Sequence, residues 1–226
     1  MTRMKNISGY IFSTALLLSF LVRPLGLNAQ DTLRTFGPRF GLDLARFLYI
    51  LADPSEVGAE FSVDFEAARN IYPILEAGYN TLSETGERFD YSAGGTYARA
   101  GLDYNILNNK DRSQHHSITF GFRYGMTVFS HRIEHIQISG SYWGIYRPQP
   151  YENSLTGHWA ELVGGMKTEL VPNLFLGWSV RVKFLLNPEM DPLMVPELIP
   201  GYGTGGESRV LGFSYSVLYM IPLFKK

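Results

Sequence analysis

The sequence predicts an all-β protein: an eight-stranded antiparallel up-and-down transmembrane β-barrel that follows a cleavable N-terminal signal peptide. Three observations lead to this fold class. Large apolar residues alternate with small or polar ones through most of the chain, and this two-residue period is typical of β-strands. Glycines and charged residues share one face of the alternating segments. The links between the segments are alternately long and short.

Composition excludes several other classes of protein. The chain has 226 residues, of which 45% are hydrophobic, 14% aromatic and 18% charged, and its mean hydropathy is −0.05. A polytopic helical membrane protein would need several apolar runs of about 20 residues, and a disordered chain would lack the 14 Tyr and 15 Phe. The absence of cysteine excludes a disulfide framework and a thiol nucleophile, and a net charge of −1 gives no reason to expect nucleic acid as a partner.

Residues 1–29 have the pattern of a secretory signal peptide. Arg3 and Lys5 form a positive start, residues 11–21 are an apolar run of suitable length, and Ala29 ends a plausible cleavage site. A transmembrane anchor is disfavoured because the run is short and is interrupted by Arg23. We therefore expect residues 30–226 to form one barrel domain in an exported protein.

The alternating segments define eight strands. The clearest is 118–128, where six large apolar residues from Ile118 to Val128 share one face while Gly121, Arg123 and Gly125 share the other. Segments 97–106, 158–170, 174–184 and 211–221 follow the same rule. In the first three segments the alternation is weaker, but the acidic residues still lie on one face of each segment. In chain order, the predicted strands are 39–48, 58–66, 70–80, 97–106, 118–128, 158–170, 174–184 and 211–221.

Glycine indicates which face of these strands lies inside the barrel. A soluble calycin-like barrel would enclose the aromatic residues, whereas a membrane barrel would turn them to lipid. Glycine weakens a strand and has no use on an open solvated face, but it makes room in a crowded interior for long charged side chains. The apolar face of the five clearest strands carries no charged residue, as lipid contact requires. Both features favour the membrane barrel.

We expect the inward charges to form an ion-pair network, because an unpaired buried charge is costly. An eight-stranded barrel is filled by its own side chains, so this network predicts a closed lumen without a permanent pore. The alternative is a gated path for protons or ions. The predicted network consists of Asp43, Glu60, Asp64, Glu76, Arg99, Asp103, Arg123, Glu161, Lys167, Arg181 and Lys183.

The lengths of the links predict the orientation of the barrel. Links 49–57, 81–96, 131–157 and 186–208 are the longer ones, and links 67–69, 107–116 and 171–172 are short or polar turns. Short periplasmic turns and long external loops are typical of bacterial outer-membrane barrels. We therefore expect the outer membrane of a Gram-negative bacterium as the location, with both termini in the periplasm.

Several segments are similar to an uncharacterised outer-membrane β-barrel family of the Bacteroidota. The similarity lies in residues 28–30 (NAQ), 119–125 (TFGFRYG), 173–181 (NLFLGWSVR) and 219–226 (YMIPLFKK), and it extends over the mature chain. These are strand and turn patterns without catalytic motifs. The resemblance implies an eight-stranded barrel resembling the OmpA transmembrane domain, and it implies no particular activity.

Two short patterns suggest catalysis, and neither is persuasive. Residues 131–135 match the H-x-x-E-H pattern of inverted zinc proteases, but that chemistry needs a helix and these residues directly follow a strand. Ser130, His131 and Glu134 lie at the predicted external rim, where a lipid-modifying barrel enzyme would hold its nucleophile and base. We expect no catalytic residues, no metal and no cofactor.

The external loops are better candidates for function, because loops on a rigid scaffold often carry recognition. The third loop has the Tyr, Trp and Arg composition of binding hot spots, which also fits an aromatic membrane belt. Its recognition candidates are Tyr142, Trp143, Tyr146, Arg147 and Tyr151. The last loop contains Met190, Leu193, Met194 and Val195, which either cap the barrel mouth or dock another protein.

The sequence therefore predicts a non-enzymatic integral outer-membrane barrel. We expect a structural or accessory subunit that binds another envelope protein, an outer-membrane protein or a lipoprotein, through its loops or its lipid-facing wall. The alternatives are a lipid A deacylase or acyltransferase-like barrel enzyme and a narrow gated channel.

Overall fold

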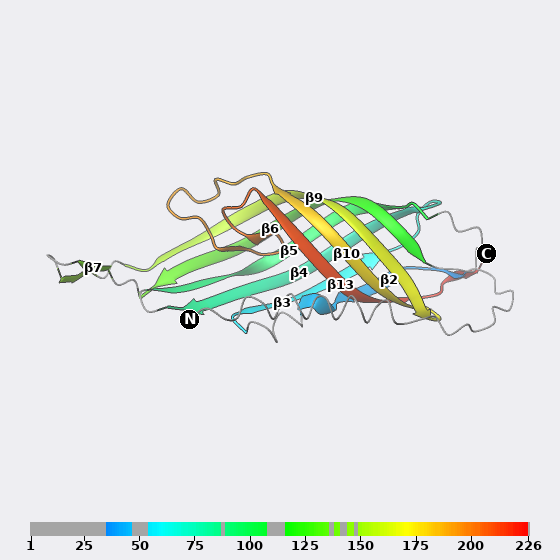
Figure 1. Cartoon of the computed structure of the whole chain (residues 1–226), viewed down its shortest axis with the longest axis horizontal. Helices are drawn as coiled ribbons and strands as arrows, with labels where there is room; N and C mark the ends of the chain where they lie inside the picture. Colours follow the sequence, from blue (N-terminus) through cyan, green and yellow to red (C-terminus); the bar gives the residue numbers. More distant parts are fainter. Residues whose placement is uncertain are drawn as a thin grey trace. The chain divides into compact units, whose positions relative to one another are not determined.

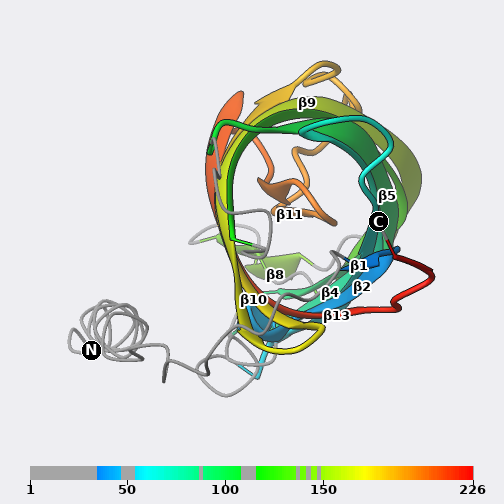
Figure 2. The ribbon, with the colours of Figure 1, turned by 90° about the vertical axis from the view of Figure 1, so that its right-hand side faces the viewer.

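A computed structural model describes residues 35–46, 54–86, 89–107, 116–135, 138–140, 144–146 and 149–225. The predicted signal peptide, residues 1–29, lies outside the described residues. Eight antiparallel strands pair in chain order, and the last pairs with the first, so the sheet closes into a barrel (Figures 1 and 2). The predicted eight-stranded barrel is thereby confirmed. No helix among the described residues is long and apolar enough to span a membrane.

The barrel strands differ widely in length. Those of the β4–β5–β6–β9 part of the sheet are the longest, with 15, 16, 18 and 21 residues. The barrel strands are β2 (Arg39–Asp43), β3 (Glu56–Asp64), β4 (Ile71–Thr85), β5 (Asp90–Asn105), β6 (Ser117–Glu134), β9 (Tyr151–Val171), β10 (Leu174–Leu185) and β13 (Arg209–Met220).

The remaining strands form three small two-stranded sheets. At one end of the barrel, here called the terminal end, β1 (Thr35–Phe36) pairs with β14 (Phe224–Lys225). At the opposite loop end, β7 (Ile138–Gly140) pairs with β8 (Gly144–Tyr146). The third sheet, β11 (Leu198–Ile199) with β12 (Gly203–Thr204), belongs to the last loop. Figure 2 shows β11 inside the ring of barrel strands.

Several predicted strand limits were wrong. The strand predicted over 39–48 ends at Asp43, where a helical turn over residues 44–46 begins. The links predicted over 81–96 and 131–157 are shorter than expected. β4 continues to Thr85, β5 already begins at Asp90, and β6 continues to Glu134. Apolar alternation stops near the loop end, while backbone pairing continues through polar residues. Counting apolar residues therefore underestimates these strands.

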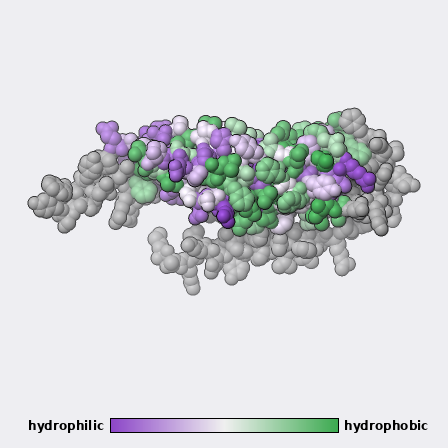
Figure 3. Space-filling model, turned by 90° about the horizontal axis from the view of Figure 1, so that it is seen from above, coloured by the Kyte–Doolittle hydropathy of each residue, from purple (hydrophilic) through white to green (hydrophobic). Residues whose placement is uncertain are grey.

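The outer wall of the barrel is apolar. On β6 the exposed side chains alternate with buried ones from Ile118 to Val128, and every exposed one is apolar. Figure 3 shows hydrophobic residues across the middle of the visible face. The exposed large apolar residues on the barrel strands are Phe40, Leu42, Phe61, Ile71, Leu75, Tyr79, Leu102, Tyr104, Ile118, Phe120, Phe122, Tyr124, Met126, Val128, Leu162, Met166, Leu170, Val171, Leu211, Phe213 and Tyr219.

Two asparagines form the tight turns at the terminal end. Asn70 and Asn173 have φ angles of 64° and 69°, in the left-handed region that Asn tolerates better than most residues. Each turn places an aromatic ring inside the barrel two residues later, Tyr72 at one turn and Phe175 at the other. The guanidinium of Arg39 lies 4.8 Å and 5.6 Å from the centres of these two rings, so the turns help to close the terminal end of the lumen.

Inward glycines lie opposite the long inward side chains. Arg99 pairs across the sheet with Gly125, Arg123 with Gly101, and Arg181 with Gly212. A Cβ added to Gly101 would lie 2.6 Å from Cγ of Arg123. The missing side chains therefore give the guanidinium groups room to lie across neighbouring strands.

This arrangement predicts a difference between inward and outward glycines. Gly125→Ala should lower the free energy of unfolding by about 1–3 kcal/mol, because its Cβ would lie 2.6 Å from Nε1 of buried Trp159. Gly164→Ala on the outer wall meets no atom within 4 Å and should leave that free energy unchanged or slightly raised. Urea titration of the two variants in the same detergent measures both effects. Equal effects would contradict the assigned faces.

Candidate functional site

The middle of the lumen holds a cluster of three arginines and three glutamates. Glu76 lies at its centre: its carboxylate is 2.8 Å from Nε of Arg99, 2.9 Å from Nη1 of Arg181 and 3.5 Å from Nε of Arg123. Glu60 and Glu161 complete the cluster by pairing with Arg99. We call these six residues the central charge layer. All six are buried inside the barrel.

A second group of charges lies closer to the terminal end. Asp64 accepts hydrogen bonds from Nε of Arg39 at 2.5 Å and from Nζ of Lys167 at 2.6 Å. Asp103 lies 3.1 Å from Nη2 of Arg123 and 3.8 Å from Nζ of Lys167, which links this group to the central charge layer. Charges of both signs are thus interleaved along the lumen, as ion pairs in a dry interior must be.

Two predicted network residues have other partners. The Asp43 carboxylate accepts hydrogen bonds from the backbone N–H groups of Ala45 and Tyr215, at 2.8 Å and 3.3 Å. The Lys183 ammonium donates to the carbonyl oxygens of Gly201 and Tyr202, at 2.7 Å and 2.8 Å. Both side chains lie inside the barrel, and Asp43 also has a side-chain hydrogen bond with Ser214.

Sequence reasoning missed three members of the network. Arg39 shares the parity of Asp43 at the start of its segment, and that signal could have found it. Tyr97 donates from its hydroxyl to Glu60 at 2.6 Å, and Trp159 donates from its indole N–H to Glu161 at 2.6 Å. Nothing in the sequence distinguishes these two from the aromatic residues of the outer wall, except that they alternate with the opposite set of positions.

A small cavity remains between the charges, and residues from all eight barrel strands line it. Hydroxyl groups line part of its wall, including those of Ser62, Ser214 and Ser216, and Lys167 and Arg181 line another part. The centres of water molecules can occupy about 40 Å³ of it. That is room for roughly two or three waters and too little for an organic ligand.

The last loop closes the half of the lumen that is nearer the loop end. Its hairpin turns at Pro200 and Gly201, where Gly201 has a φ of 79° and the N–H of Tyr202 donates to the carbonyl of Ile199 at 3.0 Å. Proline followed by a glycine of positive φ is typical of a type II turn. The tip is buried, and Met190 and Met194 pack against buried side chains, so this part of the loop caps the barrel mouth, while the exposed Leu193 and Val195 leave the docking alternative open.

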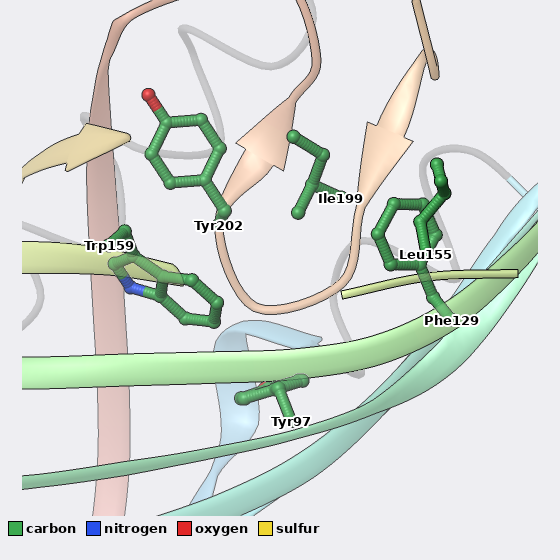
Figure 4. Close-up of a cluster of buried hydrophobic side chains, with 6 residues drawn as sticks. All are labelled: Tyr97, Phe129, Leu155, Trp159, Ile199 and Tyr202. Carbon is green, nitrogen blue, oxygen red and sulfur yellow. The ribbon is translucent and has the colours of Figure 1, made fainter. Parts of the chain in front are cut away.

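The hairpin tip packs into an aromatic pocket of the barrel wall (Figure 4). The Tyr202 ring meets the Trp159 ring edge-on, with centroids 6.1 Å apart. Ile199 and Tyr202 are fully buried in the cluster, whose members are Tyr97, Phe129, Leu155, Trp159, Ile199 and Tyr202. Met190 packs against the same cluster, while Leu193 and Val195 are 78% and 58% exposed.

The rim residues do not form the suggested catalytic arrangements. The His131 side chain points into the lumen and bonds Asp191, whereas the neighbouring Ser130 points to the opposite face of β6. His135 is exposed and bonds Asp90, and Glu134 pairs with Arg132. Among the described residues, no group of three or more His, Asp or Glu side chains could hold a metal ion.

Only part of the predicted recognition loop can be located. Tyr142, Trp143 and Arg147 lie outside the described residues, and Tyr146 is described only as the last residue of β8. Tyr151 begins β9, and its hydroxyl donates to the Asp191 carboxylate at 2.9 Å. In the described structure, Tyr151 therefore has an internal partner in the last loop.

Comparison with known proteins identifies the family. A family model described as "Domain of unknown function (DUF6048)" matches residues 6–226. The chain belongs to this family. No curated protein matches the chain at a significant level. Among solved structures, the crystal structure of CarO from Acinetobacter baumannii is similar, with 10% sequence identity and a TM-score of 0.42, over 85% of this chain and 100% of that chain.

Proposed function

We propose that this protein is an integral outer-membrane β-barrel with a closed lumen, which serves as an accessory subunit for another envelope protein. The observation that carries the membrane location is the apolar outer face of β6 from Ile118 to Val128. At about 3.4 Å per residue and a tilt near 40°, these 11 residues span roughly 26 Å along the barrel axis. That height matches the apolar band of outer-membrane barrels, about 25 Å.

The flanking residues support the proposed orientation. On the outer face of β6, the apolar band is followed by Ser130 and then by Arg132, which is half exposed and pairs with Glu134 and Glu152. The longest strands extend beyond the band at this loop end, whereas two of the links at the terminal end, 65–70 and 172–173, are short turns. Short periplasmic turns and extended external hairpins are the usual asymmetry, so we place both termini in the periplasm. The Bacteroidota origin and the signal peptide stay predictions.

A membrane assay tests the location. Expressed with its own N-terminal segment in a Gram-negative host, the protein should remain in the outer-membrane fraction after a urea or alkaline wash. It should also need detergent to stay dissolved. Exposing its apolar outer surface to water would cost about 25 cal/mol per Å² and would favour aggregation. A mature chain that stays monomeric in buffer without detergent would contradict the proposal.

The accessory role rests on the closed lumen and on the exposed apolar residues of the last loop. A lumen filled by ion pairs and a hairpin does not support a permanent pore. Leu193 and Val195 are exposed at the loop end, beyond the apolar band, and contact with another protein would remove them from water. We therefore propose that they contact an outer-membrane protein or lipoprotein at the cell surface.

Matched loop variants test the accessory role. Cross-linking in native membranes should join the protein to a specific partner, and Leu193→Lys with Val195→Lys should abolish that product. Ser83→Lys adds a charge at an exposed polar position of β4 and should leave the product intact. Cross-linking that is unchanged by the loop variants would contradict this contact surface.

A narrow gated channel is the second candidate, and the inserted hairpin favours it. The hairpin is a separate small sheet inside the ring and pairs with no barrel strand. A conducting barrel would show stepwise currents in planar bilayers, and deletion of residues 197–205 would increase their frequency. Absence of current from both proteins would leave the closed accessory barrel.

A further inference from the structure

The last loop is bound in the lumen mainly through side chains. Among the described residues, no backbone–backbone hydrogen bond joins residues 188–206 to a barrel strand. The polar contacts instead use the Lys183 ammonium, which binds two carbonyls of the tip, and the Tyr91 hydroxyl, which accepts from the N–H of Glu197 at 2.9 Å. Withdrawal of this segment would therefore break no barrel strand pairing.

A further polar attachment of the loop is a carboxylate held by the barrel wall. Asp191 binds Nε2 of His131 at 2.8 Å, and it accepts from the Tyr151 hydroxyl at 2.9 Å and from Nδ2 of Asn153 at 3.2 Å. Its own loop contributes only the N–H of Leu193, at 3.0 Å. The side chains of His131 and Asp191 are fully buried. Three side chains of β6 and β9 thus converge on one carboxylate.

Electrostatics and packing both suit an ionised carboxylate here. Burial raises the pKa of Asp191, but the hydrogen bonds from the Leu193 N–H, His131 and Tyr151 outweigh it and hold that pKa well below the usual range. Aromatic rings surround the site: the rings of Tyr91, Phe129 and Tyr151 lie 6.0–6.5 Å from the His131 ring. The wall therefore offers donors for a carboxylate beside an apolar surface.

We propose that residues 188–206 are a displaceable plug, and that His131, Tyr151 and Asn153 form a binding site for the carboxylate of an external ligand, which Asp191 occupies in the closed barrel. The ligand class is a carboxylate with an aromatic or aliphatic group, which would lie on the surrounding rings. Asp191 is tethered and so competes at a high effective concentration, and we therefore expect a bare small anion to displace it poorly. Displacement opens a vestibule that ends at the central charge layer.

Thiol labelling tests the displacement, because the chain contains no cysteine. Thr127 is buried in the lumen wall beside Gly157, where the hairpin residue Ile199 packs, and Thr127→Cys places a thiol of similar size there. In detergent-solubilised barrel, Asp191→Asn should raise the rate of maleimide labelling about tenfold, since loss of a charged, buried hydrogen-bond partner shifts an equilibrium by at least that factor.

The control and the second variant keep the result decisive. Asp90→Asn removes an equivalent carboxylate from His135 at the exposed rim and should not change the labelling rate. If Asp191→Asn does not fold, as judged by heat-modifiable gel mobility, Asn153→Ala removes a single donor and should raise the rate about threefold. Labelling that is no faster in these variants than in Asp90→Asn would overturn the displaceable plug.

Competition by added carboxylates tests the binding site separately. In the Thr127→Cys background with Asp191 intact, phenylacetate should raise the labelling rate, because it competes with Asp191 for His131, Tyr151 and Asn153, and chloride at the same ionic strength should not. Phenylacetate should act at a lower concentration than acetate, because its ring contacts the aromatic wall. A further His131→Gln change should abolish the effect of phenylacetate. Equal effects of phenylacetate and chloride would overturn the carboxylate site.

Discussion

Replacing Arg99 with Gln is expected to lower the free energy of unfolding of the barrel by about 3–5 kcal/mol. Arg99 pairs with Glu60, Glu76 and Glu161 in the central charge layer, and its side chain is 1% exposed. Without the charge of Arg99, the three buried carboxylates lose a cation that they share, and uncompensated buried negative charge destabilises the folded barrel. Urea titration in detergent micelles, followed by gel mobility and tryptophan fluorescence, measures the change.

An exposed ion pair provides the control for this substitution. Arg132 lies at the loop end, paired with Glu134 at 2.5 Å, and about half of its side chain is exposed. Water screens such a pair, so Arg132→Gln should cost less than about 1 kcal/mol. Similar losses from the two substitutions would show that the Arg99 cluster does not lie in a dry lumen.

Replacing Phe122 with Arg is expected to cost about 2–4 kcal/mol of stability in a lipid bilayer, because it places a charge near the middle of the apolar band. Phe122 is 53% exposed on the outer wall of β6, with Phe120 and Tyr124 as its neighbours on the same face. The cost should appear as a lower yield of folded protein in phospholipid vesicles and a lower urea midpoint.

The matched change on the same strand face is Ser130→Arg. Ser130 lies two residues beyond Val128, where the apolar band ends, and a charge near the interface costs only about 0–1 kcal/mol. Folding yields of this variant should therefore match those of the unmodified protein. If Phe122→Arg folded equally well in vesicles, the outer wall would not face lipid.

The interior of the barrel was largely predictable because a strand has a strict two-residue period. Once one face was assigned to lipid, parity alone placed Glu76, Arg99, Arg123, Glu161 and Arg181 in the lumen. The alternation did not predict which charged residues pair with each other, because each ion pair depends on how the sheet closes into a barrel. Glu76 and Arg181 are 105 residues apart in the chain, and they meet only across the closed barrel.

The loop-end structure could not be predicted in the same way. Residues 186–208 have no alternation, and their prolines and glycines indicated turns without indicating where the turns lie. The bond between His131 and Asp191 joins residues 60 positions apart, and its histidine belongs to a segment that local reasoning assigned to a loop. The true extent of β6 was hidden because the outward residues at its end, Ser130, Arg132 and Glu134, are polar and interrupt the apolar alternation.

By itself, the sequence determined the strand number, the parity of the charges and the apolar outer wall, because these follow from local alternation and from the cost of placing charge in lipid. Only the tertiary structure decided which charges pair, how the last loop enters the lumen and what holds Asp191. Those contacts join distant segments whose approach depends on barrel closure, and no local pattern encodes that geometry.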